Sequence, residues 1–328
     1  MTGCTVTRRK GSGRPEGVLA ALVVMFSMLL ALPGGALALT PFDPTAGEFP
    51  EGIAIDRQGA IYVTLAPRGE IRRIARNGTQ STVAQLSAPG AGFGPLGLAF
   101  DRTGRLFATA ATFDPATSGV YRVGDDGTST RIAGSEAVAL PNALAFDHAG
   151  TLFVSDSAAG AVYEIRRGAP ARLWIADPLL QGDGSFGFGV PLGANGLAYR
   201  DGSIYVAVTE LGRIVRVPIG RDGSAGAPQV VAQSPLLVGA DGIAFDVHGN
   251  LYVLANAQNN LVRLAPGGAL QTIAGATDGL DFPAGIAFGR GPLDHQSVFI
   301  VNFAIGPPGG FGPAIIDLDV GVAGQPLP

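Results

Sequence analysis

Four oxygen-bearing side chains stand at equivalent positions of a repeat along the chain: Glu51, Asn142, Asn195 and Asp241. Two carboxylates and two amide carbonyls suit a hard divalent cation such as Ca²⁺ or Mg²⁺, because two negative charges balance the charge of the metal. Four protein oxygens leave roughly two to four of the six to eight positions around Ca²⁺ for water or substrate. We therefore expect these residues to form a metal site if the fold brings them together.

A repeated phrase explains the spacing of the four residues. In this phrase Gly or Ala is followed by Ile or Leu and then by Ala, and the residues directly before its six copies are Glu51, Leu96, Asn142, Asn195, Asp241 and Ala284. The intervals of 45, 46, 53, 46 and 43 residues are typical of a four-stranded propeller blade. After the phrase come an Asp- and Gly-containing turn such as 56–59 and a second strand such as 61–63. A third strand, such as 71–74, alternates apolar and charged residues.

The repeat predicts an all-β fold, a six-bladed β-propeller of four-stranded antiparallel blades around a central tunnel. One blade has two apolar faces and cannot bury them alone, so six must stack around an axis, which also removes most free sheet edges. The first strand of each blade lines the tunnel, and its first residue lies at one mouth. The six residues before the phrase therefore form a ring, in which Leu96 and Ala284 leave gaps for a substrate.

The polar members of this ring have a second interpretation. Residues at this position border a wet tunnel, and Asn and Asp also begin tight turns. Both interpretations stay open from spacing alone. The sequence has no EF-hand loop, His-x-x-x-His pair, Gly-rich phosphate loop or Gly-x-Ser-x-Gly elbow that would indicate another site.

Residues 1–38 have the three parts of a secretory signal: basic residues at 8–14, an apolar run at 18–32, and Ala36-Leu37-Ala38 before a cleavage site after Ala38. The alternative is a membrane anchor, but an apolar run of about 15 residues is short for a span of about 20. We expect a secreted or periplasmic propeller over residues 39–320 with a C-terminal tail at 321–328. The segment 40–49 is the candidate for the missing last strand of the ring.

Removal of this signal limits the chemistry of the mature chain. It takes away Cys4 and Lys10, the only cysteine and the only lysine, and so excludes disulfides, a thiol nucleophile and Schiff-base catalysis. The remaining 18 arginines against 25 acidic residues give a net charge of about −7, which disfavours nucleic acid as a partner. Stable membrane insertion after cleavage is not expected.

The four residues also carry a family resemblance. Over residues 49–320 the chain resembles the senescence marker protein, gluconolactonase and luciferin-regenerating enzyme superfamily of six-bladed propellers, whose relatives include the paraoxonases. The resemblance implies a catalytic Ca²⁺ in the tunnel. Its ligands would be Glu51 from the first blade, Asn142 and Asn195 from middle blades, and Asp241 from a later one.

The chain departs from this family at two neighbouring positions. Leu140 and Ala143 stand where gluconolactonases place Arg and Asp, which argues against sugar-acid lactones. The His pair of paraoxonases has no counterpart, because the second blade opens with Pro95-Leu96-Gly97.

The loops between blades indicate the kind of substrate. The Gly-rich loop 183–190 carries Phe186 and Phe188, and such a loop can form a mobile apolar rim. We expect both side chains, with Asn142, to contact a small-molecule substrate, a hydrophobic lactone or ester. The alternative is that the two Phe side chains only cap the packing of the blades.

The resulting hypothesis is an exported calcium-dependent hydrolase of a lactone or related ester. Asp241 or Glu51 would accept a proton from the attacking water, although a carboxylate bound to Ca²⁺ is a poorer base. The alternative is a non-enzymatic NHL-like propeller that binds a protein or polymer. A lyase or a strictosidine synthase-like enzyme is disfavoured, because no His is placed at the tunnel mouth and the last blade contains no Glu.

Overall fold

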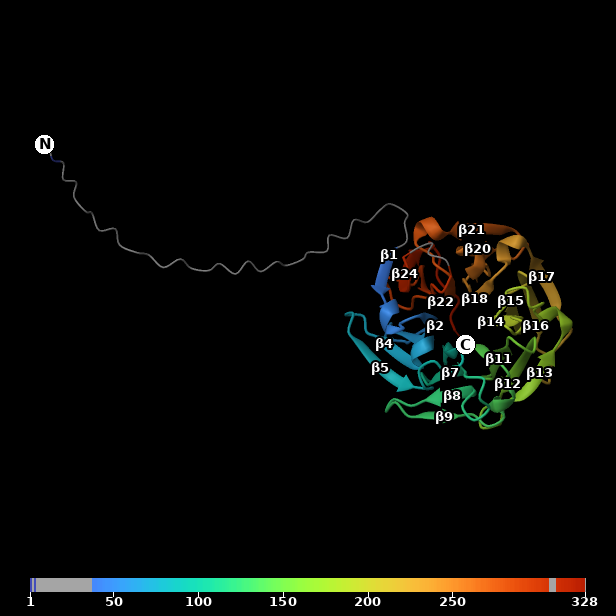
Figure 1. Ribbon diagram of the computed structural model, residues 1–328. Helices are drawn as coiled ribbons and strands as arrows, with labels where there is room; N and C mark the ends of the chain where they lie inside the picture. Colours follow the sequence, from blue (N-terminus) through green and yellow to red (C-terminus); the bar gives the residue numbers. More distant parts are fainter. Residues whose placement is uncertain (2, 4–36, 307–310, 328) are drawn as a thin grey trace. The chain divides into compact units, whose positions relative to one another are not determined.

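Hydrogen-bonded strands follow the sequence repeat closely. The computed structural model describes residues 1, 3, 37–306 and 311–327, and in these ranges 24 strands form six antiparallel sheets of four. The sheets stand around a common axis, with the first strand of each blade innermost (Figure 1). The predicted six-bladed β-propeller is confirmed.

The first three blades are consecutive in the chain. Blade 1 contains β2 (Pro50–Ile55), β3 (Ile61–Leu65), β4 (Glu70–Ile74) and β5 (Gln80–Gln85). Blade 2 contains β6 (Gly94–Phe100), β7 (Leu106–Ala111), β8 (Gly119–Val123) and β9 (Ser129–Arg131). Blade 3 contains β10 (Pro141–Phe146), β11 (Leu152–Asp156), β12 (Ala161–Ile165) and β13 (Arg172–Ala176).

The remaining blades complete the ring. Blade 4 contains β14 (Ala194–Arg200), β15 (Ser203–Val208), β16 (Arg213–Pro218) and β17 (Gln229–Gln233). Blade 5 contains β18 (Ala240–Phe245), β19 (Leu251–Ala255), β20 (Asn260–Leu264) and β21 (Leu270–Ala274). Blade 6 contains β22 (Pro283–Phe288), β23 (Ser297–Asn302), β24 (Ala314–Asp319) and, from the N-terminal side, β1 (Leu37–Pro41). The short 3-10 turns are η1 (Pro44–Ala46), η2 (Ala66–Arg68), η3 (Ser135–Ala137), η4 (Pro178–Leu180), η5 (Pro235–Leu237), η6 (Asn256–Gln258) and η7 (Ala276–Asp278).

The ring closes through β1, which pairs antiparallel with β24. This strand lies further upstream than the segment 40–49 that we expected, because Asp43 accepts a hydrogen bond from the Thr45 N–H and starts the turn η1 instead. Leu37 and Ala38, which the sequence assigned to the signal, are the first residues of β1. The rest of the predicted signal lies outside the described residues. None of the helical segments in the described part of the chain has the length and hydrophobicity of a membrane span.

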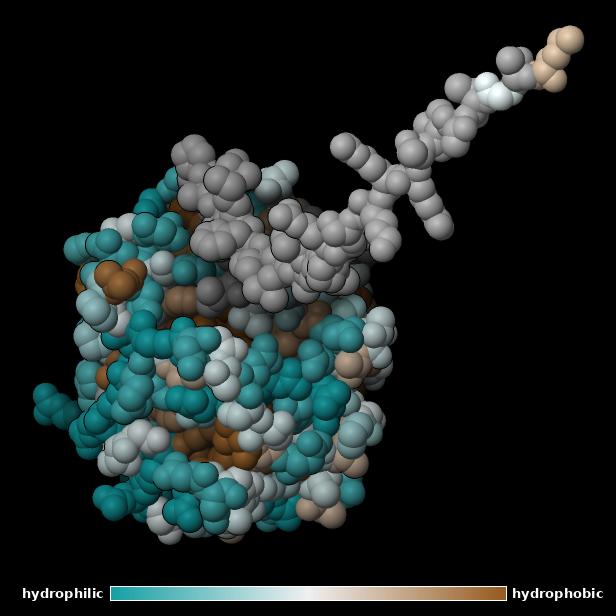
Figure 2. All heavy atoms as spheres, turned by 90° about the vertical axis from the view of Figure 1, so that its left-hand side faces the viewer, coloured by the Kyte–Doolittle hydropathy of each residue, from teal (hydrophilic) through white to brown (hydrophobic). Residues whose placement is uncertain are grey.

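Apolar side chains fill the spaces between adjacent blades. Between blades 6 and 1, for example, Ile53 and Val63 pack with Val301 and Ile315, and Phe42 beyond β1 joins the same cluster. Burying one such side chain fully contributes about 1.5–3 kcal/mol, so the stacking of blades stabilises the ring. Outside these interfaces, the side of the molecule seen in Figure 2 is largely hydrophilic, with apolar side chains visible in recesses.

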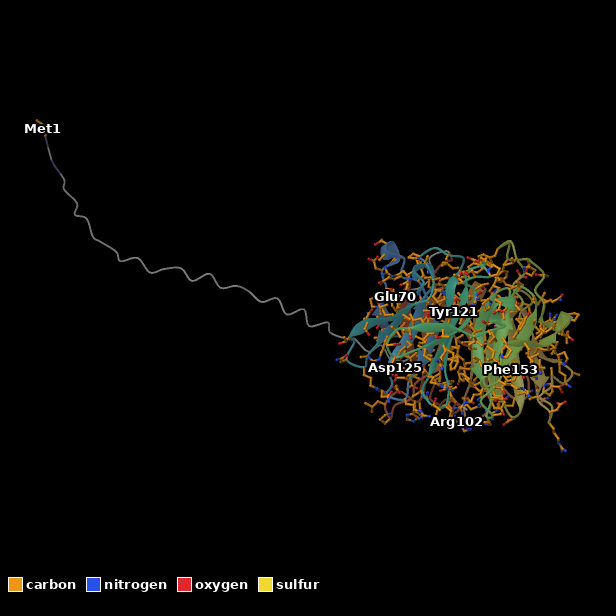
Figure 3. The ribbon with its side chains drawn as sticks, turned by 90° about the horizontal axis from the view of Figure 1, so that it is seen from below. Met1, Glu70, Arg102, Tyr121, Asp125 and Phe153 are labelled. Atoms are coloured by element: carbon orange, nitrogen blue, oxygen red, sulfur yellow. The ribbon has the colours of Figure 1, made fainter. Side chains whose placement is uncertain are left out.

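Aromatic pairs add to several of these interfaces. Phe153 on β11 packs edge to face against Trp174 on β13, with 4.7 Å between the ring centroids. Figure 3 labels Phe153 among the side chains that fill the body of the propeller.

The glycine of the repeated phrase is required by the close approach of neighbouring first strands. A Cβ on Gly52 would lie 2.0 Å from the carbonyl oxygen of Leu96, and one on Gly196 would lie 1.9 Å from that of Asp241. At Gly97, Gly242 and Gly285, a Cβ would likewise lie 2.3–2.6 Å from a carbonyl oxygen of the next blade. These glycines form a narrow belt directly below the ring at the tunnel mouth.

Candidate functional site

A β-bulge in every blade sets the direction of the ring residues. The pairing of first and second strands shifts register at this position in all six blades. In blade 1, for instance, Pro50 pairs with Leu65 but Ile53 pairs with Val63. A bulge re-aims a side chain and is common beside functional sites. Glu51, Asn142, Asn195 and Asp241 are all less than a tenth exposed.

Hydroxyl groups orient the two asparagines. Asn142 donates from Nδ2 to the Ser157 Oγ at 3.2 Å, and Asn195 donates from Nδ2 to the Thr209 Oγ1 at 3.1 Å. Each hydroxyl in turn donates to the backbone carbonyl that precedes the ring residue of the next blade, that of Ala194 or Ala240. Because the amide nitrogens are used in this way, the side-chain oxygens remain as the available ligand atoms. Asn195 Oδ1 is buried and has no hydrogen-bond partner among the described residues.

Asn256 holds Asp241 in the same manner and was missed in the sequence. Its Nδ2 donates to Asp241 Oδ2 at 3.0 Å, and its own Oδ1 is buried without a partner in the described ranges. Asn256 directly follows the second strand of blade 5, the place that Ser157 and Thr209 hold in blades 3 and 4. Alignment of the blades at this second position would have pointed to it.

Two carboxylates share the buried mouth. Burial raises the pKa of Asp241 to about 7, although hydrogen bonds from Asn256 and Asn195 oppose the rise. Burial, and then the negative charge of Asp241, raise the pKa of Glu51 well above its ordinary value. No Arg or His in the described part of the chain forms an ion pair with either group.

These features fit a divalent cation. Two adjacent carboxylates without a counterion, and unpaired amide oxygens beside them, together match the oxygen ligand set of Ca²⁺ or Mg²⁺. Within the described ranges, no three His, Cys, Asp or Glu side chains come together as a metal-binding group. A cation held by Glu51 and Asp241 would therefore need the amide oxygens of Asn142 and Asn195 as further ligands.

An apolar cluster forms another part of the mouth. It joins residues from several blades and the loops between them: Ala66, Phe93, Leu96, Ala111, Leu140, Ala158, Val190, Leu192 and Phe303. Leu96 and Leu140 are almost completely buried in it, so Leu96 is part of a wall rather than a gap. Leu140 fills the position at which a basic residue was expected for sugar-acid lactones. This wall suits an apolar substrate.

The loop with the two predicted phenylalanines is fixed by a buried carboxylate. Glu210 accepts hydrogen bonds from the Gly184 N–H at 2.6 Å and the Phe186 N–H at 3.1 Å. Glu210 directly follows Thr209, so the loop is tied to the element that orients Asn195. The Phe186 and Phe188 rings lie 6.5 Å apart, and Phe188 is 44% exposed.

Comparisons with known proteins agree with this architecture. The N-terminal model of the strictosidine synthase-like family matches residues 38–74, from β1 to β4. No curated protein sequence matches the chain significantly. Regucalcin from Agrobacterium tumefaciens, described as a calcium-binding protein, is similar with a TM-score of 0.66 at 17% identity, covering 90% of this chain and 96% of that one.

Two further solved structures are similar over nearly their whole length. A gluconolactonase from Xanthomonas campestris gives a TM-score of 0.60 at 17% identity, covering 90% of this chain and 99% of that one. A luciferin-regenerating enzyme gives a TM-score of 0.64 at 13% identity, covering 89% of this chain and 98% of that one. The fold is that of the gluconolactonase class of six-bladed propellers. The likeness in fold to gluconolactonase and luciferin-regenerating enzyme structures, which the sequence resemblance implied, is thereby confirmed.

Proposed function

We propose that the protein is a calcium-dependent hydrolase of hydrophobic lactones or related esters. The observation that carries this proposal is the pair of buried carboxylates, Glu51 and Asp241, beside the unpaired oxygen of Asn195. Similarity to structures named as gluconolactonase and luciferin-regenerating enzyme supports hydrolysis. Similarity to the calcium-binding regucalcin supports Ca²⁺, with Mg²⁺ as the other hard cation that the ligands suit.

The residues at the mouth have different roles in the proposed reaction. When bound, the cation supplies a Lewis acid that polarises the ester carbonyl and stabilises negative charge on its oxygen. Asp241, whose Oδ2 is held by Asn256, accepts the proton of the attacking water, with Glu51 as the alternative base. Asn142 orients the substrate. The wall around Leu140 excludes water and binds the apolar part of the ester.

The test is turnover of a panel of lactones and aryl esters with Ca²⁺ and with a chelator. Wild type is compared with Asp241→Asn and with the matched variant Asp125→Asn, whose carboxylate is exposed at an outer turn of blade 2. We expect hydrolysis only with metal, loss of turnover in Asp241→Asn, and full activity in Asp125→Asn. Full turnover by Asp241→Asn removes it as the base, and no hydrolysis by wild type leaves a propeller that binds a protein or polymer.

We further propose that residues 1–38 direct export to the periplasm or the medium. Cleavage after Ala38 would leave residues 39–41 of β1 to pair with β24. N-terminal sequencing of the exported protein tests this proposal, and an intact Met1 in the cell-associated fraction contradicts it.

A further inference from the structure

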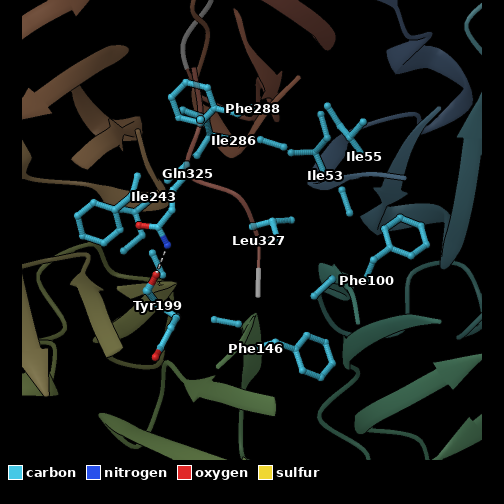
Figure 4. A pocket seen from close by; sticks show the side chains of 18 of the residues that line it. Ile53, Ile55, Phe100, Phe146, Tyr199, Ile243, Ile286, Phe288, Gln325 and Leu327 are labelled. Atoms are coloured by element: carbon cyan, nitrogen blue, oxygen red, sulfur yellow. Dashed lines mark hydrogen bonds between the residues drawn. The ribbon is translucent and has the colours of Figure 1, made fainter. Parts of the chain in front are cut away.

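The tunnel contains a cavity at the end opposite the ring residues Glu51 and Asp241. It has a volume of about 380 Å³ and is lined by the later residues of all six first strands, such as Ile55, Phe100 and Phe146 (Figure 4). The glycine belt and the ring residues lie above it. The volume falls within the range of about 300–1,000 Å³ that is typical of small-molecule sites.

The C-terminal tail forms one wall of this cavity. Gln325 anchors it at three points: its N–H donates to the Phe245 carbonyl at 2.8 Å, its Nε2 donates to the Tyr199 carbonyl at 2.9 Å, and its Oε1 accepts from Arg200 at 2.7 Å. The chain then turns into the tunnel, and Leu327 stands near its centre (Figure 4). Leu327 is nevertheless 61% exposed. An apolar side chain therefore lies inside the cavity without being packed.

An arginine at the rim adds a positive charge to the lining of the cavity. Arg290 lines it and donates from Nη1 to the Ile55 carbonyl at 3.2 Å. Burial, and then repulsion from Arg57, lower the pKa of Arg290, and the negative charge of Asp56 opposes this shift. In the described part of the chain, Arg290 forms no ion pair with a carboxylate. A guanidinium that forms no ion pair at the rim of a cavity favours an anionic partner.

We propose that this cavity is a second ligand site, for a small apolar molecule with one anionic group. The apolar part lies among the first strands against Leu327, and the anionic group binds Arg290 at the rim. This site is separate from the metal centre and does not depend on the function proposed for it.

Octanoate at neutral pH is the probe, and calorimetry with the mature full-length chain is the measurement. We expect saturable binding of one octanoate per chain, unchanged in the Glu51→Ala, Asp241→Ala double variant. Arg290→Gln is expected to weaken binding about tenfold, because it removes a charge-assisted hydrogen bond. The matched variant Arg122→Gln, at an exposed position on β8, is expected to change nothing.

A second measurement places the ligand beside the tail. In a Leu327→Trp variant, octanoate is expected to change the fluorescence of the added indole, with saturation at the concentration found by calorimetry. The single native tryptophan, Trp174, lies on the outer strand of blade 3 and provides a constant background. Absence of saturable binding overturns the proposal, and so does binding that is unaffected by Arg290→Gln or silent in the tail fluorescence.

Discussion

The buried carboxylates at the tunnel mouth predict that the metal-free protein loses stability as the pH rises. Asp241 has a pKa of about 7 in the folded state, against an ordinary value of 3.8. The folded state therefore holds this proton more tightly than the unfolded state. The stabilisation is fully present below about pH 4 and is lost as the pH rises through about 7. Since a tenfold change in an ionisation constant corresponds to about 1.4 kcal/mol, the loss from Asp241 amounts to about 4 kcal/mol.

The perturbation that isolates this effect is Asp241→Asn in the presence of a chelator. The asparagine side chain does not ionise. The substitution also removes the negative charge of Asp241, which contributes to the raised pKa of Glu51. Without metal at pH 8, we expect the variant to be more stable than wild type by up to about 4 kcal/mol. At pH 4 the two should differ little. Added Ca²⁺ should restore the stability of wild type at pH 8, because a ligand that binds only the folded state stabilises that state. It should leave the stability of the variant, which lacks one of the two carboxylates, unchanged.

Urea denaturation at pH 4 and pH 8, with chelator and with Ca²⁺, measures these free energies. Asp125→Asn is the matched control, because its carboxylate is exposed at the outer turn between β8 and β9 and is not part of the ring. If metal-free wild type is equally stable at both pH values and Asp241→Asn brings no gain at pH 8, burial does not raise the pKa of Asp241 in the folded state. The reasoning on the metal centre would then be wrong.

Three further predictions concern the surroundings of this site. Asn256→Ala should weaken Ca²⁺ binding by about 10–100-fold in calorimetry, since it holds Asp241, and an unchanged affinity would remove it as a positioning residue. Gly196→Ala should lower the melting temperature strongly, because the added Cβ would clash with the Asp241 carbonyl oxygen. Gly267→Ala is the control, since a Cβ there has open space and should be tolerated. Equal melting temperatures for the two variants would contradict the close approach of strands. Phe42→Ala should cost about 3–5 kcal/mol in urea denaturation by leaving a cavity beside the closing strand, and a loss below about 1 kcal/mol would show that this segment does not secure the ring.

The six blades could be counted from the sequence because a close backbone contact restricts the residue type at one position of each blade. At Gly52 and Gly196 the neighbouring strand leaves no room for a side chain. The same position holds glycine in five blades and Ala143 in blade 3, so a small residue recurs whatever else varies in the blade. The ring residues Glu51 and Asp241 stand directly before this position in the sequence. Their positions in the fold could therefore be assigned one by one.

The missed features depend on contacts between segments that are distant in the chain. The closing strand β1 overlaps the end of the predicted signal, and only its pairing with β24 identifies it. Asn256 is one of three different residue types at its position in successive blades, so it does not stand out as a repeat. The anchor of the loop at Glu210 and the entry of Gln325 into the tunnel likewise depend on folded geometry.

Calcium titration of the mature chain by calorimetry tests the central claim most directly. Wild type is measured beside the Glu51→Ala, Asp241→Ala double variant and beside Asp125→Asn. We predict one site per chain in wild type and in Asp125→Asn, and no binding in the double variant. Failure of wild type to bind Ca²⁺ or Mg²⁺, or equal binding by the double variant, would contradict a metal centre at this mouth of the tunnel.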